Sequence, residues 1–181
     1  MIKDNLGSWF ALGVGSNQKF DPNADWVQEL VKNNPDTLFA RGVGSNQEFD
    51  PNADWVRELL FDRRQDYYQS DYFSQISNLY TLFAGGVGSN QNLDLNADWV
   101  RNLLSNNLQS NFAFGVGSNQ NLNLNADWVK HLLQYVPSGF SSGVYDNPRV
   151  RLKLILENDL PKIYEALKFN PGHPLKKMLA V

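Results

Sequence analysis

The sequence predicts a mixed α/β repeat protein, in which each short unit contains a strand, a glycine-rich loop and a helix. Two observations support this fold class. The pattern F-A-x-G-V-G-S-N-Q-x4-N-A-D-W-V-x2-L occurs four times along the 181 residues. Each copy also changes from a short apolar run before the glycines to helical spacing after the N-A-D block. The copies begin at Phe10, Phe39, Phe83 and Phe112.

The first part of each unit is expected to be a strand. Residues 37–43 of the second copy form a short, mainly apolar run that leads into Gly42 and Gly44. Two glycines so close together indicate either a positive φ or a close approach of another backbone. The Ser-Asn-Gln that follows is typical of a loop. We therefore expect a strand that ends in a tight, glycine-rich turn.

The second part of each unit is expected to be a helix. Asp21 and Pro22 suit the N-cap and the first helical position, and Asp50-Pro51 repeats the signal. In the later copies Asp94 and Asn123 take the same place. The four apolar residues that follow in the first copy share one helical face: Trp26, Val27, Leu30 and Val31. Asn33-Asn34 and Asn106-Asn107 then mark the helix ends, where Asn tolerates the left-handed conformation.

The repeats suggest a division of the chain into two regions. The repeat region covers residues 8–136, with units near 10–34, 39–60, 83–107 and 112–135 and an insert within 61–81. One unit cannot bury both faces of its elements, so the units either stack as a solenoid or dock separately on a partner. Residues 145–181 are expected to form a basic, mainly helical module or a cap. Val150–Leu156 suits a strand or a helix, and a helix is expected after Asn158-Asp159.

Composition excludes several classes of protein. There is no cysteine, which rules out disulfides, thiolate metal sites and cysteine nucleophiles, and there are only two histidines, His131 and His173. Acidic residues dominate 1–144 and basic ones 145–181, and no region has the concentrated basic charge that nucleic acid needs. No apolar run reaches membrane-spanning length and no signal peptide is visible, so a cytoplasmic location is expected.

The candidate binding residues are the repeated polar ones. Core packing accounts for the repeated Phe, Ala, Val, Trp and Leu, and backbone geometry accounts for the glycines. The repeated Ser, Asn, Gln and Asp residues cap helices and shape turns, or they form a shared recognition surface. The predicted partner-binding set is Ser16, Asn17, Gln18, Asp25, Ser45, Asn46, Gln47, Asp54, Ser89, Asn90, Gln91, Asp98, Ser118, Asn119, Gln120 and Asp127.

Two segments of the repeat begin like known binding motifs, and neither completes the pattern of its motif. Asp21-x-Asn23-x-Asp25 begins like a calcium loop, but Trp26 and Lys32 stand where that loop needs Gly and Glu. The Gly-Val-Gly run lacks the third glycine of a dinucleotide fingerprint, and no Walker-type lysine follows it. No catalytic constellation can be assembled from the two histidines. We therefore expect no catalytic residues, no metal site and no cofactor.

The repeated Trp residues have two interpretations. Trp26, Trp55, Trp99 and Trp128 either fill the core of a solenoid, which is favoured, or anchor an interface. The function expected from the whole pattern is that of a non-enzymatic scaffold or linker, whose four equivalent motifs bind a repeated or multi-subunit protein assembly. Two alternatives are a protein with one small-ligand or cation site per repeat, and a precursor whose four copies are processed.

Overall fold

The computed structural model describes residues 4–61, 79, 81–135 and 138–154. These residues form helices and connecting turns, and no strand occurs among them. The chain divides into two compact parts, residues 1–147 and residues 148–181. The helices are α1 (Trp9–Gly15), α2 (Asp25–Asn33), α3 (Leu38–Ser45), α4 (Asp54–Phe61), α5 (Leu82–Ser89), α6 (Asp98–Asn106), α7 (Asn111–Ser118), α8 (Asp127–Leu132), α9 (Gly139–Asp146) and α10 (Pro148–Leu154).

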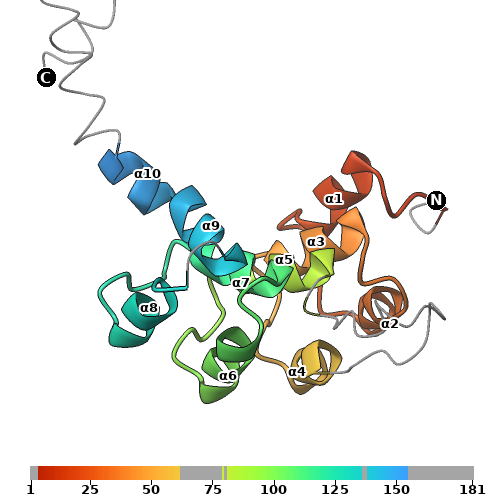
Figure 1. Ribbon diagram of the computed structural model, residues 1–181. Coiled ribbons are helices and arrows are strands. Elements are labelled where there is room, and N and C mark those ends of the chain that lie inside the picture. Colours follow the sequence, from red (N-terminus) through yellow and green to blue (C-terminus); the bar gives the residue numbers. More distant parts are fainter. Residues whose placement is uncertain (1–3, 62–78, 80, 136–137, 155–181) are drawn as a thin grey trace, which may run out of the picture. The chain divides into compact units, whose positions relative to one another are not determined.

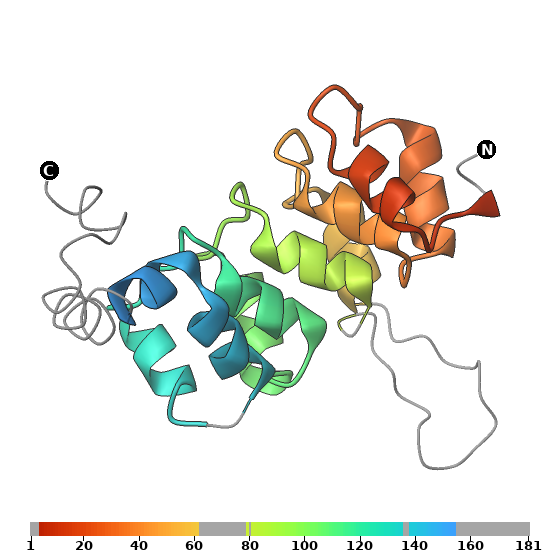
Figure 2. The ribbon, with the colours of Figure 1, turned by 90° about the horizontal axis from the view of Figure 1, so that it is seen from above.

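The first compact part, which holds all the repeat units, is a two-layer helical array. The odd-numbered helices from α1 to α9 lie side by side in chain order and form the inner layer of an arc (Figures 1 and 2). The even-numbered helices α2, α4, α6 and α8 lie outside them and fan apart (Figure 1). Among the described residues, most of the helix–helix contacts between neighbouring repeat units are therefore made by the odd-numbered helices. The units stack on one another, as in a solenoid.

The expected α/β repeat is wrong, because the predicted strands are helices. Residues 38–45, which include most of the run assigned to a strand, form α3, and the other copies are equally helical. The N-cap explains the difference: the Thr37 side chain accepts a hydrogen bond from the backbone N–H of Ala40. Phe39 and Val43 then lie one helical turn apart, and both are buried.

The glycines allow the inner helices to pack backbone against backbone. A Cβ added to Gly42 would lie 2.5 Å from the carbonyl oxygen of Leu12 in α1, and one added to Gly44 would lie 2.9 Å from that of Phe83 in α5. From the second copy on, the first glycine of the motif thus faces the preceding unit, and in all four copies the second glycine faces the following unit. The sequence predicted a strained turn or a close approach of backbones, and the close approach is what the structure shows. This packing compensates for the poor helix propensity of glycine.

A capping residue outside the recognised pattern begins every inner helix. It lies two residues before the repeated Phe, is always Ser or Thr, and its side chain accepts from the backbone N–H three residues later. The five capping residues are Ser8, Thr37, Thr81, Ser110 and Ser138. An Ncap followed by apolar residues at helical spacing is the sequence signal that distinguishes these segments from strands.

Removal of one of these caps should destabilise the array. Ser110 is buried; its hydroxyl accepts from Ala113 N–H and donates to the Asn107 carbonyl at 2.7 Å. We expect Ser110→Ala to lower the free energy of unfolding by about 1–2 kcal/mol, measured by urea denaturation. Ser105→Ala is the matched control, because Ser105 is exposed on α6, and it should change stability by less than about 0.5 kcal/mol. Equal effects of the two substitutions would contradict this role of the cap.

The second helix of each unit begins later than the sequence predicted. We expected Asp21 to be the N-cap, but α2 begins at Asp25 after Ala24, which provides no side-chain cap. Asp21 instead closes an Asx turn, in which its carboxylate accepts from the backbone N–H of Asn23 at 3.0 Å. At the other end of the helix Asn34 has a φ of −139°, so the expected left-handed conformation is absent there. Its side chain donates to the carbonyl of Leu30 instead.

The array contains a fifth, incomplete copy that the pattern search missed. Phe140, Gly143, Val144 and Asn147 occupy the places of Phe112, Gly115, Val116 and Asn119, and α9 packs against α7 as the other inner helices pack on their neighbours. Tyr145 replaces the second glycine. The division between the two compact parts of the chain falls after Asn147, whereas the sequence suggested a separate module from residue 145. The helix expected beyond Asn158 lies outside the described residues.

The core runs between the two layers. The repeated Phe is fully buried in four copies, as Phe39, Phe83, Phe112 and Phe140, together with the Val of both helices. The Trp side chains are only partly buried. Trp55 stacks on Phe83 of the next unit with ring centroids 5.8 Å apart, whereas Trp26 keeps 47% of its surface exposed.

Candidate functional site

The repeated Asn after each inner helix is a buried link between units. The amide nitrogen of Asn90 donates to the carbonyls of Gly44 and Asn46 in the preceding unit, both at 2.8 Å. The amide oxygen accepts from Asn92 N–H at 2.9 Å. Asn46, Asn119 and Asn147 donate to equivalent carbonyls of their own preceding units. Since Asn46, Asn90 and Asn119 are each 1% exposed, their side chains stabilise stacking and do not reach the surface.

The other member of this Asn row lies at the end of the array. Asn17 is exposed, and its side-chain oxygen accepts from the backbone N–H of Lys19. The serines of the motif have a local role as well. Ser16, Ser45, Ser89 and Ser118 each donate to a carbonyl three or four residues earlier in their own helix. Helix capping and unit stacking therefore explain two of the four polar residue types.

The hydrogen bonds that the repeated Gln makes to neighbouring loops through its backbone carbonyl do not explain why the residue is always Gln. The carbonyl oxygens of Gln47 and Gln91 accept from Asn92 and Asn121 in the following units, a task that any residue could perform. The side chains of Gln18, Gln47 and Gln91 are exposed, and that of Gln120 is partly exposed. Gln18 donates to the side chain of Gln47 at 3.2 Å. The Gln row thus offers amide groups along one edge of the array.

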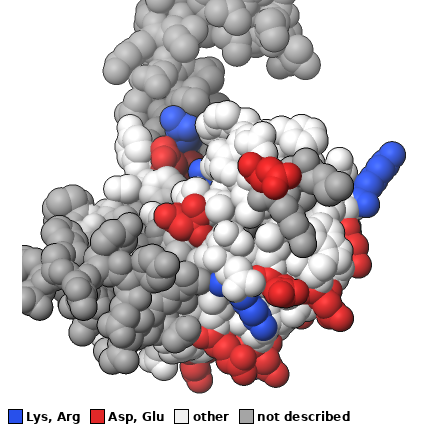
Figure 3. Space-filling view, turned by 90° about the vertical axis from the view of Figure 1, so that its right-hand side faces the viewer, with Lys and Arg blue, Asp and Glu red and all other residues white. Residues whose placement is uncertain are grey.

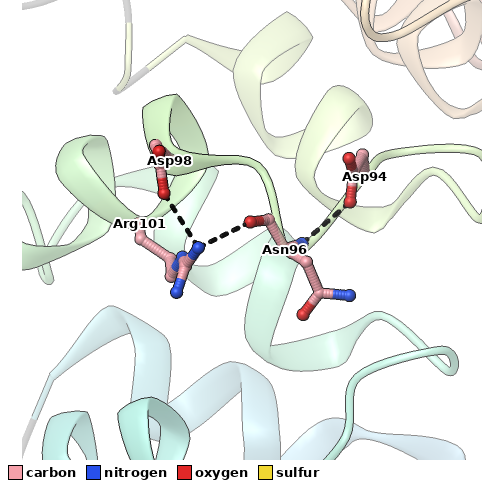
Figure 4. Close-up of polar contacts among 4 residues, drawn as sticks. All are labelled: Asp94, Asn96, Asp98 and Arg101. Atoms are coloured by element: carbon pink, nitrogen blue, oxygen red, sulfur yellow. Dashed lines mark hydrogen bonds and ion pairs between the residues drawn. The ribbon is translucent and has the colours of Figure 1, made fainter.

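The repeated Asp lies exposed at the first turn of each outer helix, where its negative charge interacts favourably with the positive end of the helix dipole. Asp54, Asp98 and Asp127 each pair with the basic residue three positions later. In Figure 4 the guanidinium of Arg101 bridges the Asp98 carboxylate at 2.9 Å and the Asn96 carbonyl at 2.8 Å, while Asp94 closes the preceding turn. Such exposed pairs contribute little to stability. Asp25 has Gln28 at that position.

The Asn of the N-A-D block provides a second set of links between units. The side chain of Asn23 donates to the Glu48 carbonyl at 2.7 Å and accepts from Asp50 N–H. Asn52 makes the same pair of bonds to Asn92 and Asp94. The Asn23 and Asn52 amides thus hold neighbouring loops together. The alternative of one small-ligand or cation site per repeat stays a prediction.

A different surface, which we call the inner face, is formed by two positions of each copy. They are the residue immediately before the repeated Phe and the residue two positions after it. These positions lie three residues apart on the side of each inner helix that points away from the core. They vary from copy to copy, unlike the scaffold beneath them. The inner face consists of Trp9, Leu12, Leu38, Arg41, Leu82, Gly85, Asn111, Phe114, Gly139 and Ser142. Sequence comparison among copies found the fixed positions and so passed over these.

The inner face is hollowed between α7 and α9. A cavity of about 320 Å³ lies there, lined by Gln109, Ser110, Asn111, Phe114, Ser138, Gly139 and Ser142. The side chain of Gln109 accepts from Gly139 N–H at 3.1 Å and so joins the two walls. The ring of Phe114 is partly exposed beside serine and asparagine side chains. This lining suits an apolar group flanked by hydrogen-bonding groups.

Charge is concentrated away from the inner face. Arg41 is its only ionisable residue, whereas acidic side chains are spread over the described part of the face in Figure 3 with few basic ones between them. Among the described residues, no three His, Asp or Glu side chains are grouped closely enough to hold a metal ion. No helix in that part of the chain has the length and apolar character needed to cross a bilayer.

Comparison with known proteins gives no relative on which to base a function. The chain matches no protein-family model, no curated protein and no solved structure. Its function must therefore be inferred from the repeat geometry itself.

Proposed function

We propose that this chain is a non-enzymatic repeat scaffold that binds a protein partner along its inner face. The observation that carries the proposal is the contrast between two sets of positions. Packing and inter-unit hydrogen bonds account for the fixed Phe, Gly, Val and Asn residues. One set of positions that vary between copies lies on the inner layer of the arc, which corresponds to the concave surface where solenoid proteins bind their ligands.

The size of the inner face favours one partner over several. Packed helices lie about 8–10 Å apart, so the five inner helices span roughly 30–40 Å. A small globular domain is about 30 Å across. Neighbouring units are therefore too close together for each to bind a separate subunit. We accordingly replace the idea of one subunit per repeat with a single segment that contacts several units.

The chemistry of the inner face indicates the kind of segment it takes. Trp9, Leu12, Leu38, Leu82 and Phe114 supply apolar and aromatic contacts, and such anchors dominate binding energy in protein interfaces. Arg41 supplies one positive charge from α3, the second of the five inner helices. An elongated, mainly apolar segment with one acidic residue is complementary to this surface. The competing candidate surface, which we call the loop edge, consists of the exposed residues of the Gln and Asp rows: Gln18, Gln47, Gln91, Asp25, Asp54, Asp98 and Asp127.

Photo-crosslinking from the full chain can separate the two surfaces. A crosslinking residue is placed at Phe114 on the inner face or at Gln47 on the loop edge, and the captured protein is identified, purified and titrated by calorimetry. We expect capture from position 114, and at least a tenfold loss of affinity in Phe114→Ala and Arg41→Ala. Gln47→Ala is the exposed control and should change affinity less than twofold. If only the Gln47 variant lost affinity, the inner face would not be the binding surface, and the partner would bind at the loop edge.

A further inference from the structure

We propose that the N-terminal end of the array is a docking surface for a glycine-bearing helix of the same repeat type, supplied by a different protein. This end face consists of Trp9, Phe10, Gly13 and Asn17. It shares Trp9 with the inner face, but the proposal rests on Phe10, Gly13 and Asn17, which lie outside that surface. The internal interfaces of the array show what such a surface binds.

Each internal interface combines four features. The repeated Phe is buried, as in Phe39 at 1% exposure. Its backbone N–H donates to a carbonyl of the preceding unit, as Phe39 does to Leu6 at 3.0 Å. The first glycine lies against the preceding helix, and the Asn amide donates to two carbonyls there. These features recur in the stacking of the later units.

The end face has the same residues without the neighbour. Phe10 is 73% exposed and Trp9 is 75% exposed, while the other repeated Phe residues are almost completely buried. No atom of the described residues lies within 4 Å of a Cβ built on Gly13. Asn17 uses its side-chain oxygen within its own loop, as the buried Asn residues do, but makes no bond to a preceding unit. The end face is therefore one half of an interface that the array builds repeatedly.

The local charge matches a partner of this kind. Helix α1 reads Trp-Phe-Ala-Leu-Gly-Val-Gly and contains no ionisable side chain. The internal interfaces between inner helices are likewise made by backbone, glycine and apolar groups. An uncharged helix with two exposed aromatic side chains favours an apolar, close-packed partner. A short helix with glycine on its outer face and free carbonyls at its end has the complementary shape.

A second copy of this chain does not supply that helix. At the C-terminal end of the array, Tyr145 replaces the second glycine and is 64% exposed. In the four complete units, a Cβ at the second glycine already crowds the backbone of the next helix. A tyrosine there prevents head-to-tail stacking, which would otherwise continue into an open filament. Tyr145 therefore excludes the C-terminal helix of a second copy as the occupant, and the proposal commits to a helix of another protein.

The test uses the chain itself as donor and as acceptor. A donor carries Tyr145→Gly and Asp146→Ser, which restore the glycine motif, and also Gly13→Val, which blocks its own end face. Titrated into the wild-type chain and followed by calorimetry and sedimentation velocity, this donor should form a one-to-one complex. It should bind at least tenfold more tightly than a Gly13→Val chain that keeps Tyr145.

Three results would overturn the proposal. The first is equal binding by donors with and without Tyr145 when circular dichroism shows that both are folded. The second is a wild-type dimer that Gly13→Val abolishes, because a second copy would then be the occupant. The third uses Gly13→Cys, which introduces the only thiol into this cysteine-free chain. Slow labelling of that thiol in the isolated chain would show that a segment of the chain itself covers the end face.

Discussion

Replacement of Gly86 by alanine is expected to destabilise the array by about 3 kcal/mol. The added Cβ would lie 2.5 Å from the Arg41 carbonyl oxygen and 3.2 Å from the Ser45 backbone nitrogen. Overpacking usually costs about 1–3 kcal/mol, and here the obstacle is backbone that cannot change rotamer. The units on either side must separate, which also weakens the burial of Phe83. Urea denaturation of the full chain measures the effect.

Gly13→Ala provides a matched control in the same motif position of the first copy. Among the described residues no helix packs against this side of Gly13, and none of their atoms lies within 4 Å of its added Cβ. The substitution should therefore raise the free energy of unfolding by about 0.5–1 kcal/mol, because alanine is the better helix former. Opposite signs for the two substitutions would show that packing between units, and not a special backbone angle, requires the glycine. A similar loss of stability in both would refute that explanation.

The sequence predicted the repeat, its stacking as one of two alternatives, and the outer helix with its buried Val27 and Val31. These features depend on local periodicity, which is written in the sequence. It did not predict the inner helices, because Gly42 and Gly44 are poor helix formers in isolation. What compensates for them is contact with α1 and α5, which depends on the arrangement of whole units in space.

The candidate site shows the same division. Repetition correctly directed attention to the Ser-Asn-Gln loops but could not distinguish a buried amide from an exposed one. Asn90 and Gln91 are adjacent and equally repeated, yet one is 1% exposed and the other lies on the surface. The inner face was missed because its residues differ between copies. A comparison for helical positions three apart, such as Leu38 with Arg41, could have revealed it.

The second large effect is expected from Asn90→Ala, which should lower the free energy of unfolding by about 3 kcal/mol. The substitution leaves the carbonyls of Gly44 and Asn46 and the N–H of Asn92 without their side-chain partner. A buried polar group that loses its partner costs about 1–3 kcal/mol. The Gly44 carbonyl bears most of this cost, because the Asn46 carbonyl keeps the N–H of Phe49 and Asn92 is exposed. Asn90→Asp should cost at least as much at neutral pH, because it keeps the shape but loses both N–H donors.

Asn17→Ala separates this structural role from recognition. Asn17 occupies the same motif position, but its side chain is exposed and accepts from Lys19 N–H within its own loop, so its removal should cost less than about 0.5 kcal/mol. Urea denaturation monitored by circular dichroism compares the two variants. A large loss in Asn90→Ala with none in Asn17→Ala would mean that the motif was repeated to join units. If instead both variants kept wild-type stability and Asn90→Ala lost only partner binding, the buried-link explanation would be wrong and the loops would be the recognition surface.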